Sequence, residues 1–157
     1  MSYNIRLEHQ TGSPLAIVRR RAQLAQLPKV VPEACGIVWN AIRANNIAGA
    51  GRHVAVYRDD VINLEVGVEL DAPLAAPLAA AGNDQVVPAT LPSGKVAATT
   101  HLGPYQNLGQ AHTAIRQWCA ANGHTLAGSN WDIYGHWQDA WNSDPSKIIT
   151  DVYYLLV

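Results

Sequence analysis

The chain has 157 residues, which is enough for one domain, or for two small fused halves, with a substantial core. Its 11 Lys and Arg nearly balance its 12 Asp and Glu, and the only basic run is the Arg triplet at 19–21, so direct nucleic-acid binding has little electrostatic support. No apolar run reaches membrane-spanning length and no signal-peptide core begins the chain. We therefore expect a cytoplasmic protein that does not contact membranes.

The first half of the chain is predicted to contain two strands, one helix and two further strands. Pro32 is expected near the first turn of the helix, where proline is tolerated. The predicted elements lie, in order, at 5–9, 15–20, 32–45, 52–57 and 61–70. The segment 71–83 is rich in Ala and Pro, and we interpret it as a linker.

The second half repeats this order of elements. Pro104 fits the first helical position and Gly123 fits a left-handed stop. The predicted elements lie at 84–91, 95–101, 105–122, 129–137 and 148–157. The pattern indicates a single α+β domain, with repeat one at 3–70, repeat two at 84–157, and two helices on one side of an antiparallel sheet.

Strand alternation separates a polar face from an apolar face on two of these strands. On 129–137, the residues Trp131, Ile133 and Trp137 suit packing under a helix, and the polar residues Asn130, Asp132, Tyr134 and His136 face water or a ligand. On 61–70, the polar face carries Asn63, Glu65, Gly67 and Glu69. Gly67 leaves room for close approach by a ligand or by backbone. From alternation alone, a plain solvated surface and a binding surface both stay open.

Two short motifs carry a resemblance to a known family. The sequence His-Leu-Gly-Pro-Tyr at 101–105 precedes a helix that bears Trp118, and Trp-Asp-Ile-Tyr at 131–134 precedes a closing apolar strand. This order resembles the GyrI-like effector-binding domain, which occurs fused to bacterial multidrug-sensing transcription regulators and as free-standing proteins. The resemblance covers nearly the whole chain, which we expect to be a free-standing member. Where family members often have Glu, this chain has Asp132.

The resemblance implies a tandem pseudo-twofold repeat with a ligand cleft between the halves. It places acidic residues on the strands that line the cleft, here Asp132 and Glu65. The expected ligand-binding residues are Asp132, Glu65, Tyr134, Trp39, Trp118, Tyr154, His136 and His101. Core packing is the alternative role for the two tryptophans, and fixing the strand-to-helix turn is the alternative for His101.

Two functions remain open at this stage. A binding module would hold hydrophobic, cationic or amphipathic molecules, because aromatic faces and a buried carboxylate attract organic cations. Some free-standing relatives resemble hydrolases of reactive hydrophobic molecules, including cyclopropane-bearing natural products. In an enzyme of that kind, Glu65 would be the general base, Asp132 would orient water or substrate, and Tyr134 would donate a proton.

No cofactor or metal is expected, because no His-Glu-x-x-His or Cys-x-x-Cys pairing is present. Cys35 and Cys119 are interpreted as buried thiols rather than a disulfide. The sequence leaves a monomer and a homodimer equally open.

Overall fold

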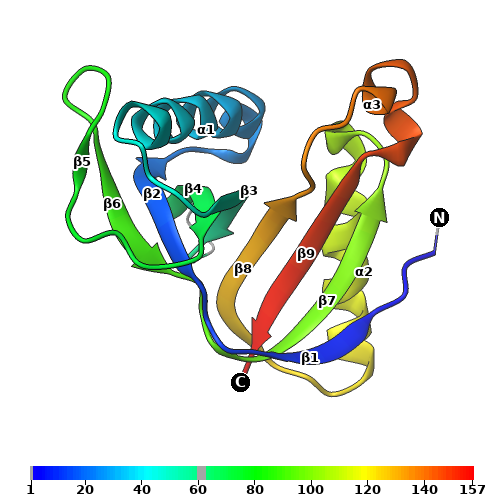
Figure 1. The fold of residues 1–157 in the computed structure, drawn as a ribbon. Coiled ribbons are helices and arrows are strands. Elements are labelled where there is room, and N and C mark those ends of the chain that lie inside the picture. Colours follow the sequence, from blue (N-terminus) through cyan, green and yellow to red (C-terminus); the bar gives the residue numbers. More distant parts are fainter. Residues whose placement is uncertain (1, 60–62) are drawn as a thin grey trace.

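The fold is an α+β arrangement in which one antiparallel sheet carries two long helices (Figure 1). The computed structural model describes residues 2–59 and 63–157, and within them the sheet has nine strands. The strands are β1 (Arg6–Gln10), β2 (Pro14–Arg21), β3 (Ala50–Tyr57), β4 (Asn63–Leu70), β5 (Leu78–Ala79), β6 (Gln85–Thr90), β7 (Gly94–Leu102), β8 (Leu126–Tyr134) and β9 (Ile149–Leu156). The helices are α1 (Leu27–Ala44), α2 (Leu108–Ala121) and the four-residue α3 (Ala140–Ser143), with single 3₁₀ turns at Leu24–Gln26, Tyr105–Asn107 and Pro145–Lys147.

The order of strands in the sheet interleaves the two halves of the chain. The order is β1-β7-β9-β8-β3-β4-β2-β6-β5, and every neighbouring pair is antiparallel. β1 therefore extends the part of the sheet formed by β7 and β9, and β6 extends the part formed by β2 and β4. Each half contributes its first strand to the other half. The sheet is thus one continuous unit, and the division into two repeats stays a prediction.

The centre of the sheet is the pairing of β3 with β8, in which Ala55 lies directly opposite Asp132. Residues directly opposite in an antiparallel pair point to the same face of the sheet. Ala55 belongs to the apolar cluster under α1, and Asp132 contacts α2 through His112. Both helices therefore cover the same face, with α1 over β2 and β4 and α2 along β7 and β9 (Figure 1).

Three apolar clusters hold the layers together. One lies between α1 and the sheet and contains Val38 and Val66, and a second lies between α2 and the sheet and contains Ile115 and Val152. The third covers the opposite face of the sheet, and its buried members are Leu15, Ile17, Val54, Val56, Leu91, Val96, Trp131 and Ile133. The prediction that Trp131 and Ile133 pack under a helix is therefore wrong. Their partners are side chains of neighbouring strands on the face without helices.

Several predicted boundaries also differ from the structure. α1 begins at Leu27, so Pro32 lies inside the helix, where it removes one backbone hydrogen bond near the exposed N-terminal end. The predicted linker contains β5, which pairs with β6. The strand predicted over 129–137 ends at Tyr134, so strand alternation does not determine which face of the sheet Trp137 lies on. The prediction that a strand begins at 61 falls partly on residues outside the described ones.

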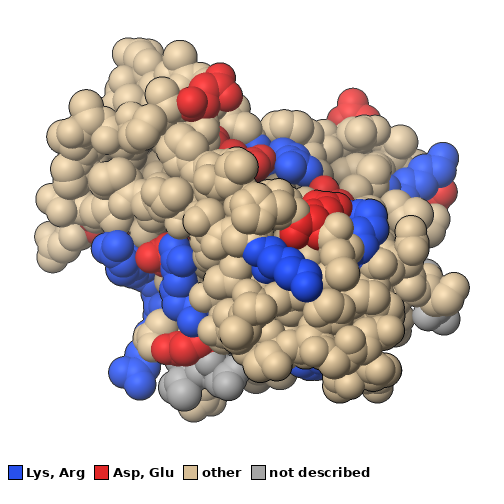
Figure 2. Space-filling view, turned by 90° about the horizontal axis from the view of Figure 1, so that it is seen from below, with Lys and Arg blue, Asp and Glu red and all other residues tan. Residues whose placement is uncertain are grey.

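The charged surface is a mixture of both signs. Figure 2 shows basic and acidic side chains side by side on the face seen from below. Charged side chains of the described residues form ion pairs: Arg52 contacts both Glu69 and Asp151, and Arg20 contacts Asp84. Among the helices of residues 2–59 and 63–157, none is both long enough and apolar enough to cross a membrane.

Gly67 provides a test of the sheet geometry. A Cβ atom at this position would collide with the carbonyl oxygen of Ala16 on β2, so close approach of backbone requires glycine here. We expect Gly67→Ala to lower the free energy of unfolding by about 1–3 kcal/mol in urea denaturation. Gly36→Ala is the matched control, because Gly36 lies in α1 with nothing within 4 Å of the added carbon. The control should raise stability by about 0.5–1 kcal/mol, and equal effects of the two changes would contradict this account.

Candidate ligand-binding cleft

A large cleft lies on the helix-covered face of the sheet, above β3 and β8. Its volume is about 1920 Å³, which exceeds that of a drug-sized molecule. Residues of α1, α2, β3, β8 and the segment after β8 line it. Its Tyr and Trp lining residues are Tyr3, Trp39, Tyr57, Tyr105, Tyr134, Trp137 and Tyr154. The lining thus joins wide apolar surfaces to polar ends, as a site for an organic molecule requires.

Asp132 is the buried carboxylate of this cleft, with 2% of its surface exposed. Its Oδ1 lies 2.8 Å from Nε2 of His112 on α2. Nδ1 of the same imidazole lies 2.7 Å from the hydroxyl of Tyr154 on β9, and Nη1 of Arg116 donates to that hydroxyl at 2.9 Å. His112, which contacts Asp132, and Arg116, which contacts Tyr154, both come from α2, where they are one helical turn apart. A buried carboxylate is stable only when paired in this way.

Tyrosine hydroxyls surround the same carboxylate on the side of β3. Tyr57 and Tyr134 both lie near Asp132, and the ring of Tyr105 meets that of Tyr134 edge-on at 5.5 Å between centroids. Burial, reinforced by the negative charge of Asp132, raises the pKa of both Tyr57 and Tyr134. These hydroxyls therefore stay protonated at neutral pH and remain hydrogen-bond donors.

The wall nearest α1 is less polar. Trp39 meets His53 of β3 edge-on at 6.0 Å, and burial lowers the pKa of His53, which favours its neutral form. Burial also raises the pKa of the Cys35 thiol to about 12, so this cysteine is not a nucleophile at neutral pH. Among residues 2–59 and 63–157, no three His, Cys, Asp or Glu side chains are grouped to hold a metal ion.

The cleft brings together five of the residues that the sequence indicated. These are Trp39, Asp132, Tyr134, His136 and Tyr154. Glu65, His101 and Trp118 are not among the residues that line it. Trp118 stacks on His124 at 5.2 Å and packs against the apolar cluster under α2, which fits the alternative interpretation as a core residue.

Glu65 does not share the cleft with Asp132, so the expectation of two carboxylates facing one cleft is wrong. Its neighbours Leu64 and Val66 belong to the cluster under α1, and alternation therefore turns Glu65 to the opposite face of the sheet. There its carboxylate is paired with Arg58 and Arg19. The apolar face of β4 packs under α1, on the same side of the sheet as the cleft. The polar face, which the resemblance places in the cleft, therefore lies on the other side of the sheet.

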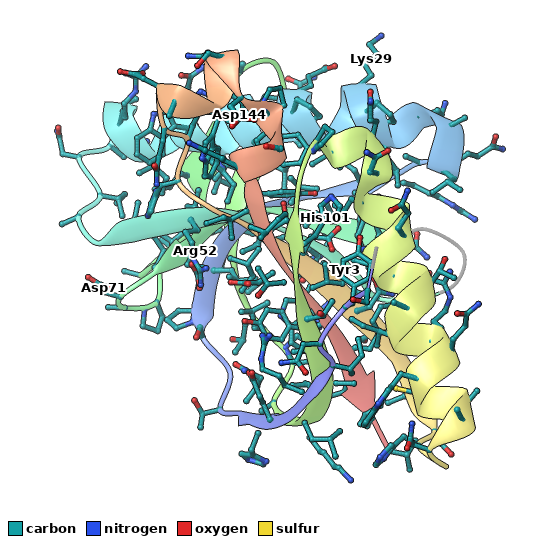
Figure 3. All side chains as sticks on the ribbon, turned by 90° about the vertical axis from the view of Figure 1, so that its right-hand side faces the viewer. Tyr3, Lys29, Arg52, Asp71, His101 and Asp144 are labelled. Carbon is teal, nitrogen blue, oxygen red and sulfur yellow. The ribbon has the colours of Figure 1, made fainter. Side chains whose placement is uncertain are left out.

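His101 fixes the turn that leads into α2. Its side chain is buried, Nε2 donates to the Pro104 carbonyl at 3.2 Å, and Nδ1 accepts from the Tyr3 hydroxyl at 2.9 Å. Figure 3 shows Tyr3 and His101 lying close together beside α2. These contacts agree with the alternative interpretation of His101 as a turn-fixing residue.

Sequence reasoning missed His112, Arg116, Tyr57 and Tyr105. His112 directly follows Ala111 of the buried helical stripe, so it lies at the edge of that stripe, where a side chain can reach the cleft. A carboxylate on a strand packed beneath this helix was a signal that the helix should supply a partner.

The family comparison decides the relationship suggested by the motifs. Residues 3–156 match the model of the GyrI-like small molecule binding domain. The chain belongs to this family. No curated protein sequence matches this GyrI-like chain.

Solved structures agree on the GyrI-like fold. The EcmrR C-terminal domain is 19% identical with a TM-score of 0.78, over 100% of this chain and 99% of that one. SAV2435 bound to tetraphenylphosphonium is 12% identical with a TM-score of 0.62, over 100% and 94%. A hydrolase encoded by lin2189 from Listeria innocua is 10% identical with a TM-score of 0.60, over 98% and 91%. At these identities the likeness shows the fold alone.

The raised pKa of Cys35 predicts slow alkylation. At about pH 8, a thiol with a pKa near 12 has roughly a thousandfold less thiolate than one with the ordinary value of 9.0. In a Cys119→Ala variant, iodoacetamide should therefore label Cys35 far more slowly in the native protein than in urea, as followed by mass spectrometry. Labelling at the same rate in both states would show that Cys35 is not held as a desolvated thiol.

Proposed function

We propose that the cleft binds hydrophobic organic cations, with the positive centre near Asp132 and the apolar groups against the aromatic lining. The observation that carries the proposal is the buried Asp132 carboxylate in a cleft lined by Trp and Tyr side chains. In a site that excludes water, a carboxylate attracts a cation more strongly than it does at a solvated surface. Each aromatic face adds about 0.5–2 kcal/mol of cation–π attraction, depending on desolvation.

The shape and hydrogen-bonding groups of the cleft favour flat or multi-ring ligands. Tyr105, Tyr134 and Trp137 offer large, rigid surfaces with a polar atom at one end, which tolerate ligands of different shape. SAV2435, which shares the fold, is described as bound to tetraphenylphosphonium, a ligand of this chemical class. Sequestering such molecules and sensing them as effectors both begin with this binding step.

Tetraphenylphosphonium is the direct probe of this proposal. We expect binding with a micromolar Kd, roughly −8 kcal/mol, and quenching of tryptophan fluorescence because Trp39 and Trp137 line the cleft. Asp132→Asn should weaken binding about tenfold, since the amide keeps the shape of the side chain and removes its charge. Glu65→Gln is the matched control, and it should leave the affinity unchanged because Glu65 lies on the other face of the sheet.

Triphenylphosphine oxide, a neutral aryl phosphorus compound of similar bulk, separates charge recognition from apolar burial. It should bind the wild-type protein more weakly than tetraphenylphosphonium does. The two compounds should bind Asp132→Asn with nearly equal affinity. If the two compounds bind equally well to the wild-type protein, the carboxylate does not recognise charge and the proposal fails.

Hydrolysis of reactive hydrophobic molecules is a second candidate, favoured by the carboxylate–imidazole pair in the cleft. Because Nδ1 of His112 accepts from the Tyr154 hydroxyl, attacking water would give its proton to His112 through that hydroxyl. The Listeria innocua neighbour described as a hydrolase shares the fold. Glu65 cannot be the base in this scheme, because it does not line the cleft and is paired with arginines. Asp132 and His112 would carry the chemistry instead.

Steady-state kinetics on activated esters, strained lactones and cyclopropyl electrophiles tests this second candidate. An enzyme that uses the pair should lose about 10²–10⁴-fold in kcat on His112→Gln. Glu65→Gln should retain the full rate. Absence of turnover above background, in a protein that binds tetraphenylphosphonium tightly, would exclude the hydrolase and leave the binding function.

A further inference from the structure

The hydrogen-bonded chain from Arg116 to Asp132 has one consistent direction. A guanidinium group only donates, so Arg116 donates to the Tyr154 oxygen, and an ionised carboxylate only accepts, so Nε2 of His112 donates to Asp132. With its proton on Nε2, a neutral imidazole accepts at Nδ1, and the Tyr154 hydroxyl supplies the hydrogen. All three bonds of the chain are therefore satisfied while His112 is neutral.

Protonation of His112 changes both the bonding and the charge of this chain. The added proton lies on Nδ1, which then donates to the Tyr154 oxygen, and the hydroxyl hydrogen of Tyr154 must turn to another acceptor. The imidazolium also lies against Oδ1 of Asp132 at hydrogen-bond distance. Its positive charge therefore offsets the negative charge of Asp132, which would otherwise attract a bound cation.

Few other charges face this position. His112 contacts Asp132 of β8 and Tyr154 of β9, and Arg116 of α2 contacts Tyr154. Tyr57 and Tyr134 lie on the side of β3. Among the described lining residues, the Asp, Glu, Lys and Arg side chains are Asp59, Arg116 and Asp132, and the histidines other than His112 are His53 and His136. The net charge beside Asp132 therefore depends on His112.

The other two histidines are poorly placed for this role. Burial lowers the pKa of His53, so it becomes charged only in more acidic solution than an ordinary histidine. His136 is exposed, where solvent and salt screen its charge.

We propose that His112 determines the charge selectivity of the cleft: the neutral imidazole leaves the charge of the Asp132 carboxylate available to a hydrophobic cation, and the imidazolium offsets that charge and weakens binding of the cation. The inference rests on the proposed binding function and names the residue that controls it. Histidine is the side chain whose charge ordinarily responds to pH near neutrality, so pH is the variable that tests this control. Because the effects are reciprocal, binding of a cation must also displace the proton from His112.

Titration with tetraphenylphosphonium, which has no proton to lose, tests the inference. By calorimetry, we expect the wild-type Kd to be about tenfold weaker at about pH 5.5 than at about pH 8. His112→Gln can still donate to Asp132 but cannot become charged, so its Kd should change by less than about twofold over the same range. His9→Gln is the matched control and should keep the full pH dependence, because His9 is exposed on β1 and does not line the cleft. Near pH 6.5, binding should release protons in the wild-type protein and none in His112→Gln, as measured in buffers of different ionisation enthalpy.

The possible outcomes distinguish failure of this inference from failure of the proposed function. If wild-type protein binds the cation equally at both pH values, His112 does not control selectivity and the binding function stands. If His112→Gln keeps the pH dependence, protonation of Asp132 itself is the cause and the inference is wrong. If the wild-type protein binds no cation at either pH, the proposed function and this inference fail together. Thermal unfolding of each variant, with His112→Asn as a second substitution, confirms that the comparison is made on folded protein.

Discussion

The burial of the Asp132 carboxylate is the constraint on which the arrangement of the cleft depends. A carboxylate with 2% exposure must be paired, and the nearest element able to supply a partner is α2, which packs on the same face of the sheet. His112 meets this need, Tyr154 in turn contacts the other nitrogen of the imidazole, and Arg116 donates to the Tyr154 hydroxyl. In the proposed function, the carboxylate held in this way is the group that attracts the cation.

The interleaved sheet gives the cleft a rigid floor. Asp132 and Ala55 face each other across the β3–β8 pairing, and the exchanged strands β1 and β6 tie each half of the chain to the other. Both helices pack on this common sheet. The α1 residues that line the cleft include Leu27, Val31 and Trp39, whereas α2 contributes His112 and Arg116, so the cleft is more polar on the side of α2.

The sequence was sufficient to predict the family, the order of elements and the polar face of β8, because strand alternation and the two motifs are local signals. It was insufficient for Glu65, because alternation divides a strand into two faces without showing which one a helix covers. The apolar face of β4 packs under α1, and its polar face turns away from the cleft. The exchange of β1 and β6 was likewise hidden, since strand order depends on long-range pairing. His112 was missed because a single histidine beside an apolar stripe acquires meaning only when β8 lies beneath it.

A crystal structure of the protein with tetraphenylphosphonium tests the central claim most directly. The cation should occupy the space between α1 and α2, with phosphorus within roughly 6 Å of the Asp132 carboxylate and phenyl groups against Tyr134 and Trp137. The Asp132–His112 contact should remain in the complex. A cation bound outside this cleft, or bound in it far from Asp132, would contradict the account.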